Sequence, residues 1–346
     1  MARYLEAAWY FGGWADQIKA GEARGLTLAE REIAVYRSEQ RQVFAIGNRC
    51  PHRFAPLHLG KVKGDLLECG YHGLQFAGSG SCAFNPHMKN GAGGSISVPS
   101  YAVEERYGAV WIWLSAEVAP DPSLIPDFSH LSSFPATAHL FVETMDVTAD
   151  YELIVDNLLD PTHSEFVHVG VLGGDGLQFG IHAKVRETSH MLEADYHYDG
   201  VAAVPLMRQF LPDVEHVDSW LTCTYYAPGY VTVVGGIKPA GAPREEGVWA
   251  GAYHILMPTK LHQTRYDVMT TRGFQPDDVA LTTTLRDGGA YAFNEQDKPI
   301  IEAQQAMMGE NEFWDLKPAL FPSDAPAVKV RRKLQGLIDA QLAVAA

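Results

Sequence analysis

The chain has 346 residues, with 42 acidic and 27 basic side chains, so its formal net charge is −15. This balance argues against a nucleic-acid partner and against an anionic membrane surface, because both are bound mainly by excess Lys and Arg. No apolar run approaches the roughly 20 residues needed to cross a bilayer, and four cysteines are too few for a disulfide scaffold. The N-terminal segment MARYLEAAWYFGGWADQ lacks a signal-peptide pattern, so we expect a cytoplasmic location.

Short β-strands dominate the prediction for the N-terminal part. REIAVYR (31–37) and QVFAIG (42–47) are rich in β-branched and aromatic residues and are separated by a polar loop, which predicts a hairpin. LLECGYHGLQF (66–76) and AVWIWL (109–114) predict further strands. We therefore expect a small all-β domain over residues 1–115.

A proline- and serine-rich segment, residues 116–139, predicts a linker to a second domain over residues 140–346. Within that second domain, segments rich in β-branched and aromatic residues predict an antiparallel sheet. A segment near the end of the chain predicts a closing amphipathic helix. The corresponding segments are 220–236, 249–258 and 262–274 for the strands and 326–343 for the helix. The fold class predicted for this second domain is α+β.

Four potential metal ligands lie in the segment CPHRFAPLHLGKVKGDLLECGYHG (50–73). Cys50 and His52 form Cys-x-His, and after sixteen residues Cys69 and His72 form Cys-x-x-His. A structural zinc site is one alternative, but it usually begins with Cys-x2–4-Cys and ends with a His pair; buried core residues are another.

We interpret the pattern as a Rieske [2Fe–2S] cluster, in which two cysteines bind one iron and two histidines bind the other. Cys50 and Cys69 would then bind the first iron, and His52 and His72 the second. No further cysteines flank the motif to form the supporting disulfide of respiratory Rieske proteins. The lower-potential oxygenase type is therefore favoured.

A second constellation lies in YELIVDNLLDPTHSEFVHVG (151–170), whose apolar residues predict a half-buried helix: Leu153, Ile154, Leu158 and Phe166. Asp160 and His163 are three apart and would be neighbours on one helical face. His163 and His168 are five apart, so they converge only if the helix bends or ends, which Pro161 makes plausible. From spacing alone, a metal site and a structural role for these side chains both remain open.

Three motifs together, CPHRFAPLHLG…ECGYHGLQF, DNLLDPTHSEFVH and FNEQDKPIIEAQQ (293–305), resemble the Rieske non-haem iron oxygenases, as the large (alpha) subunit of aromatic oxygenase systems. The segments AWYFGG, YHGLQF and NPH (85–87) resemble more narrowly the branch of vanillate O-demethylase and dicamba monooxygenase. The resemblance implies an N-terminal all-β Rieske domain followed by an α+β catalytic domain, whose antiparallel sheet is flanked by helices that carry a mononuclear iron.

By position in these motifs, the resemblance implies that His163, His168 and Asp297 bind the mononuclear Fe(II) as a two-histidine, one-carboxylate triad. It also implies that Asp160 connects this iron to a Rieske histidine of a neighbouring subunit in a homotrimer. Pro299 follows Asp297 by two residues, so we expect Asp297 near the start of a helix that runs through IIEAQQAMM.

Two residues are assigned to substrate binding, His254 and Asn157. GAYHILMPT, which contains His254, is similar to the strand that carries a carboxylate-binding histidine in dicamba monooxygenase. The alternative is a core histidine bonded to the backbone. The neighbouring strand YVTVVGG does not supply that enzyme's partner asparagine. The resemblance nevertheless implies a small aromatic acid as substrate.

The predicted function is that of a terminal oxygenase component. It would use O2 and electrons from a ferredoxin or flavin reductase, and thus indirectly from NAD(P)H, to O-demethylate a methoxy-substituted aromatic acid with release of formaldehyde. Ring hydroxylation and N-demethylation remain alternatives, because the iron motifs do not determine the substrate. A more distant alternative is a Rieske electron carrier without a catalytic iron. Four basic residues near the cluster ligands predict docking of an acidic electron donor: Arg49, Arg53, Lys61 and Lys63.

Overall fold

The structure is a computed structural model that describes residues 3–129, 139–173 and 183–345. None of the described helices is long and apolar enough to cross a membrane. Residues 130–138, which belong to the predicted linker, lie outside the described residues.

The chain forms two compact units. One unit comprises Met1–Ile125 together with Leu337–Ala346, and the other comprises Pro126–Gly336. The domain division expected from the sequence, with boundaries at residues 115 and 139, stays a prediction.

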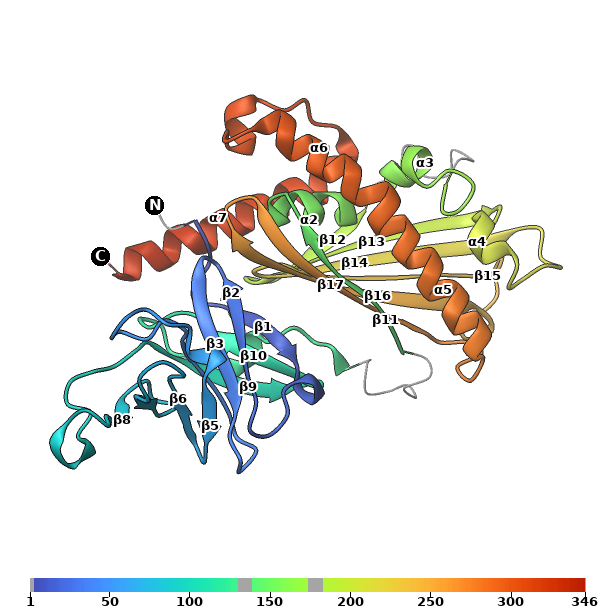
Figure 1. Ribbon diagram of the computed structural model, residues 1–346. Coiled ribbons are helices and arrows are strands. Elements are labelled where there is room, and N and C mark those ends of the chain that lie inside the picture. The colour runs from blue at the N-terminus through green and yellow to red at the C-terminus, as the bar shows by residue number, and fades with distance from the viewer. Residues whose placement is uncertain (1–2, 130–138, 174–182, 346) are drawn as a thin grey trace. The chain divides into compact units, whose positions relative to one another are not determined.

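The first unit contains a six-stranded antiparallel sheet and a four-stranded antiparallel sheet (Figure 1). The larger sheet has the order β1-β10-β9-β4-β3-β2, with bounds β1 Trp9–Trp14, β2 Ala23–Leu28, β3 Arg31–Arg37, β4 Val43–Gly47, β9 Ser100–Arg106 and β10 Ala109–Trp113. The smaller sheet has the order β5-β6-β7-β8, with bounds β5 Lys61–Lys63, β6 Leu66–Glu68, β7 Gln75–Phe76 and β8 Cys82–Phe84. The predicted β3–β4 hairpin and the strand β10 are confirmed.

The prediction of a single strand over residues 66–76 is wrong. The segment divides into β6 and β7, which pair with each other across a turn that contains Cys69 and His72. Gly73 adopts a φ of +74° in this turn, a conformation that glycine reaches without the steric cost of a Cβ atom. The turn therefore projects the two candidate ligands from the end of a short hairpin.

The second unit is built on a seven-stranded antiparallel sheet with the order β11-β17-β16-β15-β14-β13-β12. The bounds are β11 His139–Val147, β12 Lys184–Glu187, β13 Met191–Val201, β14 Val217–Tyr226, β15 Tyr230–Pro239, β16 Val248–Lys260 and β17 Gln263–Arg272. The predicted antiparallel sheet is confirmed, and the segment 220–236 proves to be a hairpin of β14 and β15.

Helices pack against this sheet, and α5 crosses over several of its strands (Figure 1). The helices of the unit are α2 Tyr151–Leu159, α3 Ser164–Val167, α4 Pro205–Arg208, α5 Val279–Tyr291 and α6 Lys298–Met308, together with the first part of α7 Ala325–Ala345, whose residues from Leu337 onward belong to the first unit. A 3-10 segment, Pro161–His163, separates α2 from α3, and a π-helical segment, Ala292–Asp297, connects α5 to α6.

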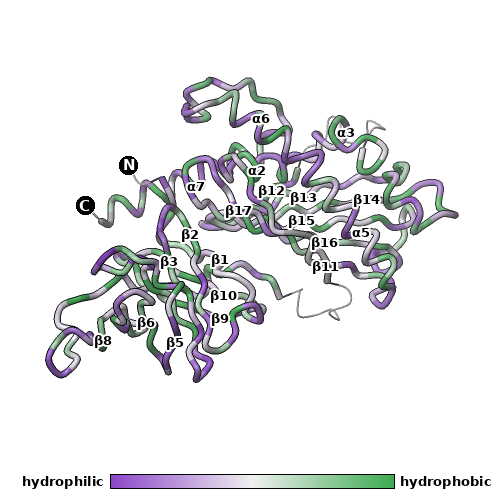
Figure 2. The backbone as a smooth tube through the Cα atoms, in the orientation of Figure 1, coloured by the Kyte–Doolittle hydropathy of each residue, from purple (hydrophilic) through white to green (hydrophobic). Residues whose placement is uncertain are grey.

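The closing helix α7 is amphipathic, as predicted. Ala327, Val330 and Leu334 are buried and recur at intervals of three and four residues, whereas Arg332 is exposed. Hydrophilic and hydrophobic residues alternate along α7 in Figure 2, as expected for a helix with one buried face.

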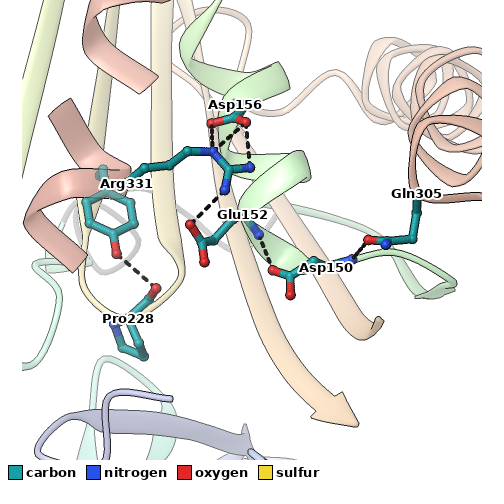
Figure 3. Close-up of polar contacts among 7 residues, drawn as sticks. Asp150, Glu152, Asp156, Pro228, Gln305 and Arg331 are labelled. Atoms are coloured by element: carbon teal, nitrogen blue, oxygen red, sulfur yellow. Dashed lines mark hydrogen bonds and ion pairs between the residues drawn. The ribbon is translucent and has the colours of Figure 1, made fainter. Parts of the chain in front are cut away.

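A polar network ties α2 to both α6 and α7 (Figure 3). Arg331 of α7 donates to Asp156 from Nε and Nη2, at 2.9 and 2.7 Å from Oδ2, and to Glu152 from Nη1 at 2.9 Å. At the start of α2, the backbone N–H of Asp150 donates to Oε1 of Gln305 in α6 at 3.0 Å. The helix α2 is thus held at its first residues and near its middle.

The prediction of one half-buried helix over residues 151–170 is wrong in its second half. The helix α2 ends at Leu159, and its carbonyl ladder is interrupted where Pro161 offers no backbone N–H. Leu153 and Ile154 are buried as expected, but Phe166 is 73% exposed. Between the two histidines the helix α3 ends at Val167, and His168 has a non-helical backbone, so the helix ends where the spacing required it to bend or end.

Asp297 directly precedes α6, so it lies near a helix start as expected, but it does not begin a separate helix. Helical backbone continues from α5 through the π-helical segment into α6, and Asp297 is the last residue of the π-helical segment. Lys298 donates its N–H to the carbonyl of Phe293, five residues back. This wider turn lets the chain pass Pro299, which has no N–H to donate, without ending the helix. The predicted helix through IIEAQQAMM is confirmed as α6.

Candidate metal centres and substrate cavity

Two loops of the first unit share one backbone pattern around Cys50 and Cys69. In each loop the cysteine N–H donates to the carbonyl five residues later, at 3.0 and 2.7 Å, and the cysteine carbonyl accepts from the N–H four residues later, at 2.9 and 3.0 Å. The residue four positions after each cysteine, Phe54 or Gly73, has a positive φ of 61° or 74°. The two loops therefore present their cysteines and histidines in similar ways despite different spacings.

The candidate cysteine ligands lie in the core of the unit, whereas the candidate histidine ligands lie toward its surface. Cys50 and Cys69 are 1% and 2% exposed and belong to the hydrophobic core of this unit. Burial raises the pKa of the Cys50 thiol, and the nearby Cys69 thiol raises it further. The rings of His52 and His72 lie 4.4 Å apart at the end of the two loops. Two buried sulfurs beneath two adjacent imidazoles fit the donor set of a Rieske [2Fe–2S] cluster.

Close packing fixes the two loops against each other. A Cβ atom on Gly60 would lie 1.8 Å from the carbonyl oxygen of Glu68 in β6, so only glycine allows the first loop this approach. Nε2 of His87 lies 3.0 Å from the carbonyl oxygen of His72, which adds a contact behind the second loop. His87 belongs to the NPH segment and was not assigned a role from the sequence.

The second unit brings His163, His168 and Asp297 together. Their ligand atoms all lie within 4.8 Å of one another, with Nε2 of His168 at 3.2 Å and Nε2 of His163 at 3.6 Å from Oδ1 of Asp297. The histidines flank α3, which ends at Val167 so that His168 leaves the helical path, and the carboxylate arrives from the π-helical segment. Two imidazole nitrogens and one carboxylate are the donor set of the iron triad that leaves open coordination positions.

Hydrogen bonds on the far side of each ring select the nitrogen that faces the triad. Nδ1 of His163 donates to the carbonyl oxygen of Asp160 at 2.5 Å, and Nδ1 of His168 donates to Oε1 of Gln296 at 2.9 Å. With the proton on Nδ1, each Nε2 keeps its lone pair available for a metal. Burial lowers the pKa of His168, but its contacts with Asp297 and Gln296 outweigh burial and raise that pKa overall.

Asp160 lies at the bend between α2 and the 3-10 segment, and not on a shared helical face with His163 as expected. Its Oδ1 accepts hydrogen bonds from the N–H of Thr162 at 2.9 Å and from the Thr162 hydroxyl at 2.7 Å. Within the part of the chain that the structure describes, Oδ2 has no hydrogen-bond partner. The carboxylate therefore caps the turn with one oxygen and keeps the other for a further contact.

A cavity of about 390 Å3 adjoins the triad, within the size range of small-molecule sites. Asn157 lines it from α2 and donates from Nδ2 to Oδ1 of Asp297 at 3.4 Å. Leu158, Leu172 and Phe293 are among its apolar walls, so most of the lining offers no hydrogen bond. The cavity is thus an apolar space with the triad at one side.

The register of β16 and β17 defines the sheet face that lines this cavity. Ala250, Ala252 and His254 alternate along β16 and pair with Arg272, Thr270 and Val268 of β17. Side chains of alternate residues point to the same face of a sheet, and all of these except Val268 line the cavity. Small side chains on β16 therefore leave the space that the cavity occupies.

His254 lines the cavity but is only 1% exposed. Its Nδ1 lies 2.7 Å from the hydroxyl of Tyr266, and its ring packs edge-on against Phe293 at a centroid distance of 5.3 Å. Burial lowers the pKa of His254 to about 3. His254 is therefore a neutral imidazole in the cavity wall.

Sequence reasoning missed three residues around these sites. Gln296 orients His168, Tyr266 bonds to His254, and Arg272 brings a buried guanidinium to the cavity wall. Gln296 stands beside Asp297 in the motif, but its contact with His168 crosses 128 positions of sequence. No local pattern identifies a partner at that separation.

Comparison with known proteins assigns the class. Residues 8–102 match the Rieske [2Fe–2S] domain, and residues 147–340 match the vanillate O-demethylase oxygenase C-terminal domain. The chain belongs to the Rieske non-haem iron oxygenases. Within this family, its C-terminal domain is of the vanillate O-demethylase type.

Individual relatives are similar to this chain over nearly its whole length. The chain is 32% identical to the oxygenase component of chloroacetanilide N-alkylformylase from Rhizorhabdus wittichii, covering 98% of this chain and 97% of that protein. It is 30% identical to the oxygenase component of dicamba O-demethylase from Stenotrophomonas maltophilia, covering 96% and 98%. A crystal structure of dicamba monooxygenase bound to dicamba superposes with a TM-score of 0.87 at 30% identity, covering 98% and 99% of the two chains.

These matches confirm the predicted family, fold class, enzyme class and cofactors. The protein is an oxygenase component with a Rieske [2Fe–2S] cluster and a non-haem iron, and it works with a separate electron-transfer component. The alternative of a Rieske electron carrier does not account for a catalytic domain that matches over residues 147–340.

Proposed function

We propose that this oxygenase removes an alkyl group from a small aromatic substrate by hydroxylating the carbon bonded to oxygen or nitrogen, with O-demethylation as the leading case. The apolar cavity of about 390 Å3 beside His163, His168 and Asp297 carries the proposal, because it can hold one aromatic ring next to the triad. The relatives named for O-demethylation of dicamba and vanillate, and for N-dealkylation of chloroacetanilides, support the same class of reaction.

In this proposal the two donor sets hold the two metal centres. Cys50, Cys69, His52 and His72 hold the [2Fe–2S] cluster, and the triad of the catalytic unit holds Fe(II). When bound, these centres supply single electrons and activate O2. Oriented by their Nδ1 hydrogen bonds, the two triad histidines present Nε2 to the metal, and the cavity walls exclude water from the substrate.

The net reaction balances for a methyl ether. An aryl methyl ether, O2, two electrons and two protons give the aryl hydroxymethyl ether and water; one oxygen atom enters the substrate and the other is reduced. The hydroxymethyl ether is a hemiacetal, and cleavage of its C–O bond gives a phenol and formaldehyde. For an N-alkyl substrate the corresponding carbinolamine gives the dealkylated nitrogen and an aldehyde.

We further propose that the electron path uses Asp160 between subunits of a homotrimer, and that a ferredoxin or flavin reductase delivers electrons from NAD(P)H. The unbonded Oδ2 of Asp160 supports a contact beyond its own turn. The predicted aromatic acid stays a prediction, as do the cytoplasmic location and the domain boundaries.

The test is product analysis with the holoenzyme and a surrogate reductase. Methoxyaromatics and N-alkyl anilides are incubated with NADH and O2, and formaldehyde or another aldehyde is measured beside the phenol or dealkylated anilide. We expect one aldehyde per aromatic product, and no product from His168→Ala. Ring-hydroxylated products that keep their alkyl groups would overturn the proposal.

A further inference from the structure

The cavity beside the triad continues along the helix α5, away from the metal ligands. Thr284 and Gly288 of α5 line it, as does Ala292 at the start of the π-helical segment. These residues recur every four positions, so they lie on one face of the helix. Gly288 precedes Asp297 by nine residues, which is about 13 Å of helix. The cavity therefore has a far end that is remote from the triad.

The sheet forms a second wall of the same length. Ala250 of β16 precedes His254 by four residues, which is about 13 Å along a strand. Ala252 lies between them on the same face, and Gly235 of β15 pairs with Ala250. All four line the cavity, and α5 crosses over several strands of this sheet (Figure 1). Small side chains thus border the far end on the sheet as well as on the helix.

The other side chains around the far end offer mainly apolar surface. Leu285 of α5 and Ile237 of β15 line the cavity there. Arg272 pairs with Ala250, but four of its five N–H groups donate to the chain itself: to the carbonyl oxygens of Phe274, Gln275 and Asp278 and to the hydroxyl of Thr282. An apolar group gains free energy by leaving water for such walls.

Gly288 leaves space that another residue would fill. A Cβ atom built on it would meet no heavy atom within 4 Å among the described residues outside its own stretch of helix. Its backbone is helical, so alanine would fit without strain, and alanine is more favourable than glycine in a helix interior. The glycine therefore weakens α5 without a steric need in the backbone. What it provides is room in the cavity wall.

We infer that Gly288 sets the length of the substrate. The substrate is an aromatic ether or N-alkyl aromatic whose ring carries a second apolar group, a further ring or an alkyl chain, opposite the alkyl group that is removed. This second group lies between Gly288 on α5 and Ala250 on β16. A single methoxybenzene ring with its methyl group at the triad is too short to reach that end. The inference rests on the proposed dealkylation and names its substrate class.

The test measures binding without turnover. The holoenzyme is kept anaerobic and without reductant, and equilibrium dialysis compares three methyl ethers of increasing length: anisole, 4-propylanisole and 4-methoxybiphenyl. We expect at least one of the two longer ethers to bind at least tenfold more tightly than anisole, because its extension is buried in the far end. A gain of less than tenfold for both longer ethers overturns the inference.

Variants of Gly288 test its place in the wall. Gly288→Leu should weaken binding of the longer ethers at least tenfold and change binding of anisole less than twofold. Gly288→Ala should raise the temperature of unfolding, since it favours the helix, and yet weaken binding of the longer ethers. An equal loss for anisole and the longer ethers, or no loss for any of them, overturns the role of Gly288.

Gly336 supplies the matched control. It is an exposed helical glycine of α7 with no heavy atom near its Cβ position, and it does not line the cavity. Gly336→Leu should bind all three ethers as the unchanged chain does. Circular dichroism and iron content show that each variant is folded and loaded. Because no product is formed in these measurements, failure of the inference is distinguishable from failure of the dealkylation proposal, which is judged by aldehyde release.

Discussion

Arg331 of α7 and Asp156 of α2 form a bidentate ion pair, with Nε at 2.9 Å and Nη2 at 2.7 Å from the same carboxylate oxygen (Figure 3). Asp156 directly precedes Asn157, whose Nδ2 lies 3.4 Å from the triad residue Asp297. The closing helix therefore holds α2, which carries Asn157 and precedes the segment of the triad histidines. A contact between residues 175 positions apart supports a site that neither residue touches.

Arg331→Met should destabilise the catalytic unit, because it leaves the carboxylates of Asp156 and Glu152 facing each other without their cation. We expect a loss of about 3 kcal/mol in the free energy of unfolding, and less mononuclear iron in the purified protein. The neighbouring exposed residue supplies the control: Arg332→Met should change stability by less than about 0.5 kcal/mol. Urea titration with iron analysis measures both, and equal behaviour of the two variants would contradict the role of Arg331.

Gln305→Leu should loosen the tie between α6, which follows Asp297, and α2. The buried amide accepts from the N–H of Asp150 and donates to the carbonyl of Gly309, and leucine leaves both groups without a partner. We expect Fe(II) affinity to fall about tenfold, the lower end of the range for partners outside the ligand shell. Competition with a coloured chelator measures this affinity. The exposed Gln304→Leu on the same helix is the control and should bind iron normally.

Alanine at any residue of the triad should remove the mononuclear iron and its activity. His163→Ala, His168→Ala and Asp297→Ala each delete one of the three ligand atoms, while the Cys50 and Cys69 loops belong to the other unit and should keep their visible absorption. Cys69→Ala, in contrast, should abolish the visible absorption of the Rieske cluster. The exposed His216→Ala serves as control. Full turnover by any triad variant would remove that residue from the site.

Substitution of Asp160 separates an electron path from a turn cap. Asp160→Asn keeps an oxygen that can accept from the N–H of Thr162 but loses the charge, so the cap should survive. If the carboxylate connects the metal centres, single-turnover oxidation of a pre-reduced cluster should slow at least tenfold with both metals retained. Thr162→Val, which loses only the hydroxyl contact, should react normally. Normal single turnover in Asp160→Asn would leave Asp160 as a cap worth about 1 kcal/mol.

Salt should slow reduction by the electron donor. Arg49, Arg53 and Lys61 are exposed around the cluster loops, whereas Lys63 is paired with Glu68 at 2.5 Å and contributes less. Electrostatic steering weakens as ionic strength rises, so stopped-flow reduction by an acidic ferredoxin should slow steeply. Arg53→Gln should reduce the rate and its salt dependence more than Lys19→Gln, which removes a charge outside the loops. A rate independent of salt would contradict this docking surface.

Local patterns in the sequence predicted the elements that form through interactions between residues close in sequence. The β3–β4 hairpin follows from strand propensity, and α7 follows from its apolar spacing. The same patterns did not predict burial or hydrogen-bond partners that depend on contacts between residues far apart in sequence. Nothing near Phe166 indicates its exposure, and nothing near Gln296 indicates that it orients His168. Such contacts form only when the sheet and its helices assemble, so a single sequence does not encode them in a readable motif.

The π-helical segment Ala292–Asp297 has a consequence for how this enzyme tolerates insertions and deletions. Its wide turn holds one residue more than an α-helical turn would. Loss of any single codon between 292 and 296 would let the helix close into regular α geometry, and Asp297 would keep nearly the same direction relative to α5, because the wide turn already absorbs the extra residue. Since α5 lines the cavity and Asp297 belongs to the triad, such a deletion would keep the carboxylate directed at the two imidazoles, whereas loss of one codon within α5 would rotate Asp297 by about 100° relative to the start of that helix.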